Sequence, residues 1–171
     1  ALRELADRRY WRRRPKESTE AQAYVFDMAA SRPGIVVADA IKNTLGYTLV
    51  SAPMKELLAK HATAEIEFTP CKLKNHKKRF VTEELFIANV LGTLDCVDRA
   101  KTVGREDPVN PGRYMSITQL AFNDRINPAV NLFRLAVRPK YLIFREDLKA
   151  IVEAGALTGL VFSRVGDKVR L

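Results

Sequence analysis

The sequence predicts an α+β fold: a single domain with a mixed sheet, in which two similar strand-helix-strand units pack around a central buried element. Three observations predict it. The chain of 171 residues has the size of one ordinary domain with a real core. A nearly continuous apolar stretch occupies residues 85–94, and a strand, helix, strand pattern occurs on each side of it. We expect residues 23–171 to form this domain and residues 1–22 to form a basic N-terminal arm.

The arm contains a segment, residues 2–14, with the apolar spacing of a short helix, followed by a polar linker. Tyr10 and Trp11 lie among its arginines. Such a mixture of rings and basic side chains can stack on bases and bind phosphates, or the rings can pack back on the domain. Both readings stay open from the sequence.

Several shorter elements follow from local patterns. We expect a helical turn at residues 39–45, with Gly46 at its C-cap position. Residues 104–116 are dense in Gly, Pro, Asn and Asp, which predicts a surface loop. Short strands are expected at residues 23–28, 34–37, 117–122 and 132–137.

The two similar units are residues 47–70 and 141–164, which align with an offset of 94 residues. In each, a strand precedes a helix with a buried apolar stripe, and a half-buried strand follows. In the first unit Ser51 can cap the helix and Pro53 fits its first turn. We expect the units to superpose. The aligned pairs are Tyr47 with Tyr141, Leu49 with Ile143, Lys55 with Lys149, Leu57 with Ile151, Leu58 with Val152, Ile66 with Leu160, and Phe68 with Phe162.

The central element, residues 85–94, is expected to be buried on more than one side because it is nearly all apolar. It ends on charge at Asp95, Asp98 and Arg99. Arg134, between apolar neighbours, either faces solvent or is buried and paired, and Asp95 or Asp98 would be natural partners. We predict that Asp95, Asp98, Arg99 and Arg134 form a structural charge cluster. A binding role for the same residues stays open.

The net charge of +9 indicates an acidic partner, which could be a nucleic acid, an anionic membrane or an acidic protein surface. Much of the excess lies in residues 1–17, where seven basic residues oppose three acidic ones, and a second basic cluster occupies residues 72–79. The predicted partner-binding residues are Arg8, Arg9, Tyr10, Trp11, Arg12, Arg13, Lys77 and Lys78.

Chemistry-bearing residues are sparse. Only His61, Cys71, His76 and Cys96 could supply nitrogen or sulfur ligands, and their spacing is not that of a zinc site. A Cys96 nucleophile with His76 as base has no oxyanion element nearby, and Asp95 with Asp98 is one carboxylate pair without a third acid. We therefore predict no enzyme, no cofactor and no metal.

The cellular compartment follows from the same composition. No apolar run approaches the roughly 20 residues of a membrane helix, so we expect no membrane partner. Two separated cysteines and no recognisable secretory signal favour a reducing, cytoplasmic location.

The order of motifs resembles an immunity-protein family of bacterial polymorphic toxin systems, the one numbered eleven. Its pattern has a strand ending in Val-Ser before a Leu-rich helix, a Glu-x-x-Pro strand, and an Asn-Val-Leu run into Asp-x-x-Asp-Arg. Phe-Arg before a later strand and a closing Leu-Thr-Gly-Leu complete it. The matching residues are Leu49, Val50, Ser51, Leu57, Leu58, Glu67, Pro70, Asn89, Val90, Leu91, Asp95, Asp98, Arg99, Phe133, Arg134, Leu157, Thr158, Gly159 and Leu160. Where the family has Lys-Ser after Asp-Arg, this chain has Ala100, Lys101 and Thr102.

The likeness covers roughly residues 24–165 and leaves the basic arm outside. It implies a cytoplasmic antidote that binds and neutralises a toxin domain delivered by sibling or rival cells, without catalysis. The basic charge fits an acidic toxin surface better than a nuclease, because inhibitors of nucleases tend to be acidic. The alternative function is a nucleic-acid-binding module that uses the N-terminal arm. The oligomeric state is not predicted.

Overall fold

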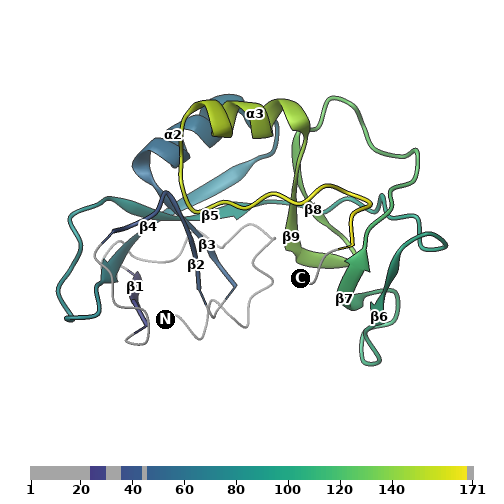
Figure 1. Ribbon diagram of the computed structural model, residues 1–171, viewed down its shortest axis with the longest axis horizontal. Coiled ribbons are helices and arrows are strands. Elements are labelled where there is room, and N and C mark those ends of the chain that lie inside the picture. Colours follow the sequence, from purple (N-terminus) through teal and green to yellow (C-terminus); the bar gives the residue numbers. More distant parts are fainter. Residues whose placement is uncertain (1–23, 30–35, 44–45, 169–171) are drawn as a thin grey trace.

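The structure, a computed structural model, describes residues 24–29, 36–43 and 46–168. It is an α+β fold around a curled, mixed five-stranded sheet with the order β1-β4-β5-β3-β2, in which only β1 and β4 pair in parallel (Figure 1). The strands are β1 (Tyr24–Asp27), β2 (Ala40–Lys42), β3 (Thr48–Ser51), β4 (Ile66–Lys74) and β5 (Leu85–Val90).

Two helices, α2 (Ala52–His61) and α3 (Glu146–Ala154), lie side by side over one face of this sheet (Figure 1). Ser51 caps α2 by accepting a hydrogen bond from the Met54 amide at 3.4 Å, and Pro53 lies in the first turn. Met54 and Leu58 bury the inner side of α2, as Leu148 and Val152 do for α3. The predicted helix of the first unit is therefore confirmed, with the predicted cap.

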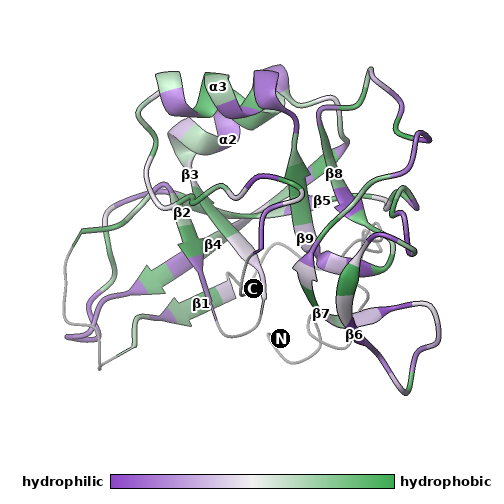
Figure 2. Cartoon of the chain, turned by 45° about the vertical axis from the view of Figure 1, so that its right-hand side comes forward, coloured by the Kyte–Doolittle hydropathy of each residue, from purple (hydrophilic) through white to green (hydrophobic). Residues whose placement is uncertain are grey.

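The predicted central element is confirmed over residues 85–90, which form β5 in the middle of the sheet between β3 and β4, whereas residues 91–94 lie beyond the strand and are only partly buried or exposed. Its alternating side chains enter two cores: Ala88 and Val90 pack against the helices, and Leu85 and Ile87 pack on the opposite face of the sheet. Apolar residues, green in Figure 2, are concentrated in the strands. The element is buried on both sides because both faces of its strand are covered.

A second lobe is built from two β-hairpins beside the main sheet (Figure 1). They are β6 (Val103–Glu106) with β7 (Tyr114–Gln119), and β8 (Leu132–Leu135) with β9 (Arg138–Phe144). Their core includes Cys96, Ile117, Leu135 and Val137. Leu94 joins the lobes, because its amide donates to the Arg134 carbonyl at 2.8 Å and its carbonyl accepts from the Ala136 amide at 2.9 Å.

Three local predictions were wrong. Residues 36 and 37, the described part of the predicted strand 34–37, form no strand. Residues 40–42 form strand β2 and not part of a helical turn, because they pair with residues 48–50 of β3. The predicted loop 104–116 contains strand residues at both ends, and its turn-forming residues occupy only the connection between β6 and β7. Asp107 orders that connection by accepting the Val109 amide at 2.9 Å.

The two predicted strand-helix-strand units share their strand and helix but not their last strand. The first unit is strand, helix, strand (β3, α2, β4), and the second has β9 and α3 at the offset expected from the sequence. Its predicted last strand is wrong, since residues 157–164 form no strand. Gly159 has φ +90°, outside the extended region, and the apolar side chains around it, such as Phe162, pack against the helix-side core. Superposition of the two units stays a prediction.

Candidate partner-binding surface

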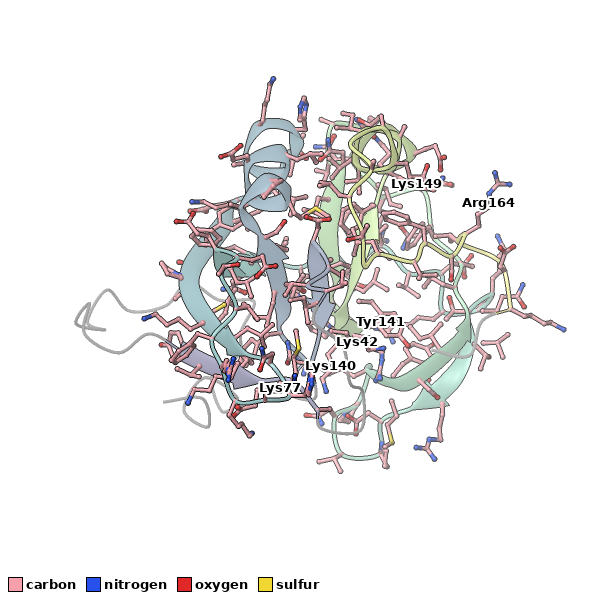
Figure 3. The ribbon with its side chains drawn as sticks, turned by 60° about the vertical axis from the view of Figure 1, so that its left-hand side comes forward. Lys42, Lys77, Lys140, Tyr141, Lys149 and Arg164 are labelled. Atoms are coloured by element: carbon pink, nitrogen blue, oxygen red, sulfur yellow. The ribbon has the colours of Figure 1, made fainter. Side chains whose placement is uncertain are left out.

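The predicted binding residues fall into two groups. Arg8, Arg9, Tyr10, Trp11, Arg12 and Arg13 lie outside the described residues. Lys77 and Lys78 lie in the connection between β4 and β5, and both are exposed. Lys77 lies toward the end of the molecule away from the helices, where Lys42 of β2 and Lys140 of β9 also lie (Figure 3).

The connection between β4 and β5 is an ordered turn. The Asn75 amide donates to the Arg79 carbonyl at 2.8 Å, and the Asn75 side-chain oxygen accepts the amides of Lys77 at 2.9 Å and Arg79 at 3.1 Å. Lys78 has φ +60°, the left-handed conformation that closes such a turn. Its ammonium contacts the Asp27 carboxylate at 3.1 Å. The basic side chains at this tip are therefore carried by a fixed backbone.

Phe80, which was not predicted as a binding residue, pairs with Lys74 across this turn and is 54% exposed. The Lys74 and Lys72 ammoniums lie 5.0 Å and 5.6 Å from the centre of its ring, within cation-π range. We call residues 72–80 the basic hairpin. Its sequence, KLKNHKKRF, has five Lys or Arg and no Asp or Glu. The signal in the sequence was an aromatic residue directly after the basic run.

A second polar site joins residues far apart in the sequence. The Asp39 carboxylate accepts the Ser51 hydroxyl at 2.7 Å, and the amide and hydroxyl of Thr158 at 2.8 and 2.9 Å. Burial pushes the Asp39 pKa upward, but these hydrogen bonds outweigh it and hold the pKa below its ordinary value. Ser51 and Thr158 both belong to the motifs that suggested the family, and Asp39 was not predicted. The site fastens the C-terminal segment to the start of α2.

Two other motif residues have structural contacts. Asn89, buried in β5, donates to the Glu67 carboxylate at 3.2 Å. Arg134 is only 3% exposed, and its guanidinium donates to the carbonyls of Val90 at 2.9 Å and Pro139 at 2.8 Å. Arg134 therefore ties β8 to the end of β5 through backbone carbonyls.

The other members of the predicted charge cluster, Asp95, Asp98 and Arg99, lie after β5 in a segment that ends in a turn at residues 99–101. Asp98 accepts the Ala100 amide at 3.0 Å and contacts the Lys101 ammonium at 3.3 Å. Partial burial acts to raise the Asp98 pKa, but the hydrogen bonds from Lys101 and Ala100 have the larger combined effect, so the pKa lies below its ordinary value. Asp95 and Arg99 are exposed. Asp98 and Arg134 thus have different partners in the contacts described, and their union in one cluster stays a prediction.

The thiols are poorly suited to nucleophilic chemistry. Cys71 and Cys96 are free and buried. Burial raises the pKa of Cys71 to about 11, and burial together with the charge of Asp95 raises the pKa of Cys96.

Within the described ranges, no group of three or more His, Cys, Asp and Glu side chains is placed to hold a metal ion. No helix among these residues is long and apolar enough to cross a membrane.

Comparison with known proteins identifies the family. A model of the Immunity protein family (Imm11) matches residues 3–167, nearly the whole chain. The match includes most of the basic arm, so the expectation that the arm lies outside the likeness was wrong. No curated protein matches the sequence. The chain belongs to the Immunity protein family (Imm11).

Proposed function

We propose that this protein binds one cognate toxin of a bacterial polymorphic toxin system and neutralises it stoichiometrically in the cytoplasm. The family match over residues 3–167 carries the proposal, since an immunity family implies a toxin partner. Proteins of immunity families are in general not enzymes, so inhibition is expected to come from occupying the toxin's surface. In this proposal residues 1–22 form the basic arm and residues 23–171 form the binding domain.

Two features of the chain support this reading. The net charge of +9 favours a partner with an acidic face, and a cluster of that charge lies on the basic hairpin. The buried thiols with raised pKa values suit a structural part in a reducing compartment. The arginines of the arm, Arg8 to Arg13, are proposed to attract the same acidic face from a distance.

The test is growth rescue. The product of the open reading frame adjacent to this gene is induced in a bacterial host with and without this chain. We expect growth arrest by the product alone and normal growth when both are expressed. Arrest in both cultures, with this chain folded and abundant, would contradict the proposal. Tight, salt-sensitive binding of the purified chain to a DNA duplex without any protection would favour the nucleic-acid function instead.

A further inference from the structure

We propose that the basic hairpin, residues 72–80, is the surface that docks on the toxin. In this arrangement the Phe80 ring enters an apolar pocket, and the lysines around it face carboxylates on the rim of that pocket. The inference rests on the proposed function. It adds the location of the interface and the chemistry of the partner, which is an acidic protein surface with an apolar centre.

Phe80 is the argument for an apolar centre. Aromatic residues are usually among the more buried residues, yet Phe80 is 54% exposed. An aromatic anchor surrounded by polar groups that exclude water is the arrangement found at energetic centres of protein interfaces. Phe80 follows directly after the turn of residues 75–79, and among the described residues it is exposed enough for a partner to contact its side chain. Its burial would therefore stabilise a complex directly.

The lysines are the argument for an acidic rim. Strand alternation turns Cys71 and Leu73 of β4 into the core and leaves Lys72 exposed beside the Phe80 ring, with Lys74 partly buried there. Carboxylates facing these ammoniums would gain attraction while the ring is being buried. A cationic rim also repels basic partners, which gives the surface selectivity.

The fixed turn is the argument for a binding role over a merely solvated tip. Asn75 holds the turn through its side chain, and the Val81 amide donates to the Leu73 carbonyl at 2.9 Å. Leu73 is 3% exposed and anchors this end of the hairpin in the core. Ordering a loop on binding costs free energy, and a loop that is already ordered avoids that cost.

The central test compares Phe80→Ala with the native chain, using the adjacent-frame product as the probe and surface plasmon resonance as the readout. We expect Phe80→Ala to weaken binding roughly 30-fold, mostly through faster dissociation. Its control is Val109→Ala, which removes apolar surface from another exposed side chain, 81% exposed, between β6 and β7. The control should bind like the native chain. Equal melting temperatures for all three proteins establish that the fold is retained.

A charge reversal tests the rim. Lys77→Glu should slow association about tenfold at low salt, with a smaller effect at high salt, because it acts through long-range attraction. The matched control is Arg125→Glu, an identical charge change at an exposed residue of the second lobe. The control should slow association much less.

The outcomes separate this inference from the proposed function. If the native chain binds and neutralises the probe but Phe80→Ala and Lys77→Glu behave as their controls do, the hairpin is not the interface and the proposed function stands. If the native chain neither binds nor neutralises the probe, both fail. If the two hairpin variants lose binding to a DNA duplex and keep binding to the probe, the hairpin is a nucleic-acid surface and the inference is overturned.

Discussion

Arg134 offers the sharpest test of the structural reading of the family motifs, because its charged side chain is almost completely buried. Replacement by Met keeps most of the volume and removes the donors to the Val90 and Pro139 carbonyls. Hydrogen bonds from a charged group contribute about 1.5–3 kcal/mol each, so two account for about 3–6 kcal/mol. Relief of the buried charge offsets part of this loss. We expect Arg134→Met to lower the free energy of unfolding by about 3 kcal/mol.

Urea denaturation followed by circular dichroism measures this change. With an m-value of about 2 kcal/mol/M, the midpoint should fall by about 1.5 M. Arg134→Lys keeps the charge but lacks the planar fork of donors, so it should be destabilised as well. Arg125→Met, at an exposed position, should stay within about 0.5 kcal/mol of the native chain. A loss below about 1 kcal/mol for Arg134→Met, or an equal loss in the exposed control, would refute the reasoning.

Three further predictions concern other parts of the chain. Gly159→Ala should lower the free energy of unfolding by several times the roughly 1 kcal/mol that Ala costs in a left-handed conformation, because the new Cβ would also meet a β2 carbonyl. Gly166→Ala, with φ +96° and open space around the new Cβ, should cost only the conformational part, and chemical denaturation compares the two variants. The pKa of Asp39 is lower in the folded chain than in the unfolded one, so its contribution to the free energy of unfolding is complete above the unfolded pKa near 3.8 and is lost as the pH falls through the folded pKa. In Asp39→Asn the free energy of unfolding should therefore fall less steeply as the pH is lowered from about 5, and an unchanged slope would contradict this. Deletion of residues 1–16 should slow association with the toxin and reduce its salt dependence while dissociation changes little, and faster dissociation would place the arm in the interface.

Elements with a strong local signal were predictable from the sequence. The apolar run at residues 85–90 became the central strand β5, and the Ser-x-Pro start with its apolar stripe became helix α2. Both carry their information in consecutive residues. Strand β2 has three residues and no period of its own, and it exists because β3 supplies its hydrogen bonds. A short edge strand of this kind is fixed by its partner and is misread when taken alone.

The candidate site was predictable only as a set of residue types. The basic run containing Lys77 and Lys78 is visible in the sequence, but the exposure of Phe80 depends on how the turn directs its ring. The partners of Arg134 are backbone carbonyls, which no side-chain pattern reveals. Asp39 and Thr158 are 119 residues apart and meet only after the C-terminal segment returns to β2. Long-range contacts and backbone acceptors are therefore what the sequence left out.

The proposed antidote function, inhibition of a toxin by binding, can be measured by a titration. The toxic activity of the adjacent-frame product is measured while this chain is added in increasing amounts, and calorimetry of the same pair gives the stoichiometry. The account predicts that activity falls linearly and disappears at an equimolar ratio, at the point where the heat of binding saturates. Loss of toxic activity at far below equimolar amounts of this chain would show that the chain acts by turnover. Saturable binding without loss of toxic activity would show that the chain binds the product without inhibiting it. Either result would contradict inhibition by stoichiometric binding.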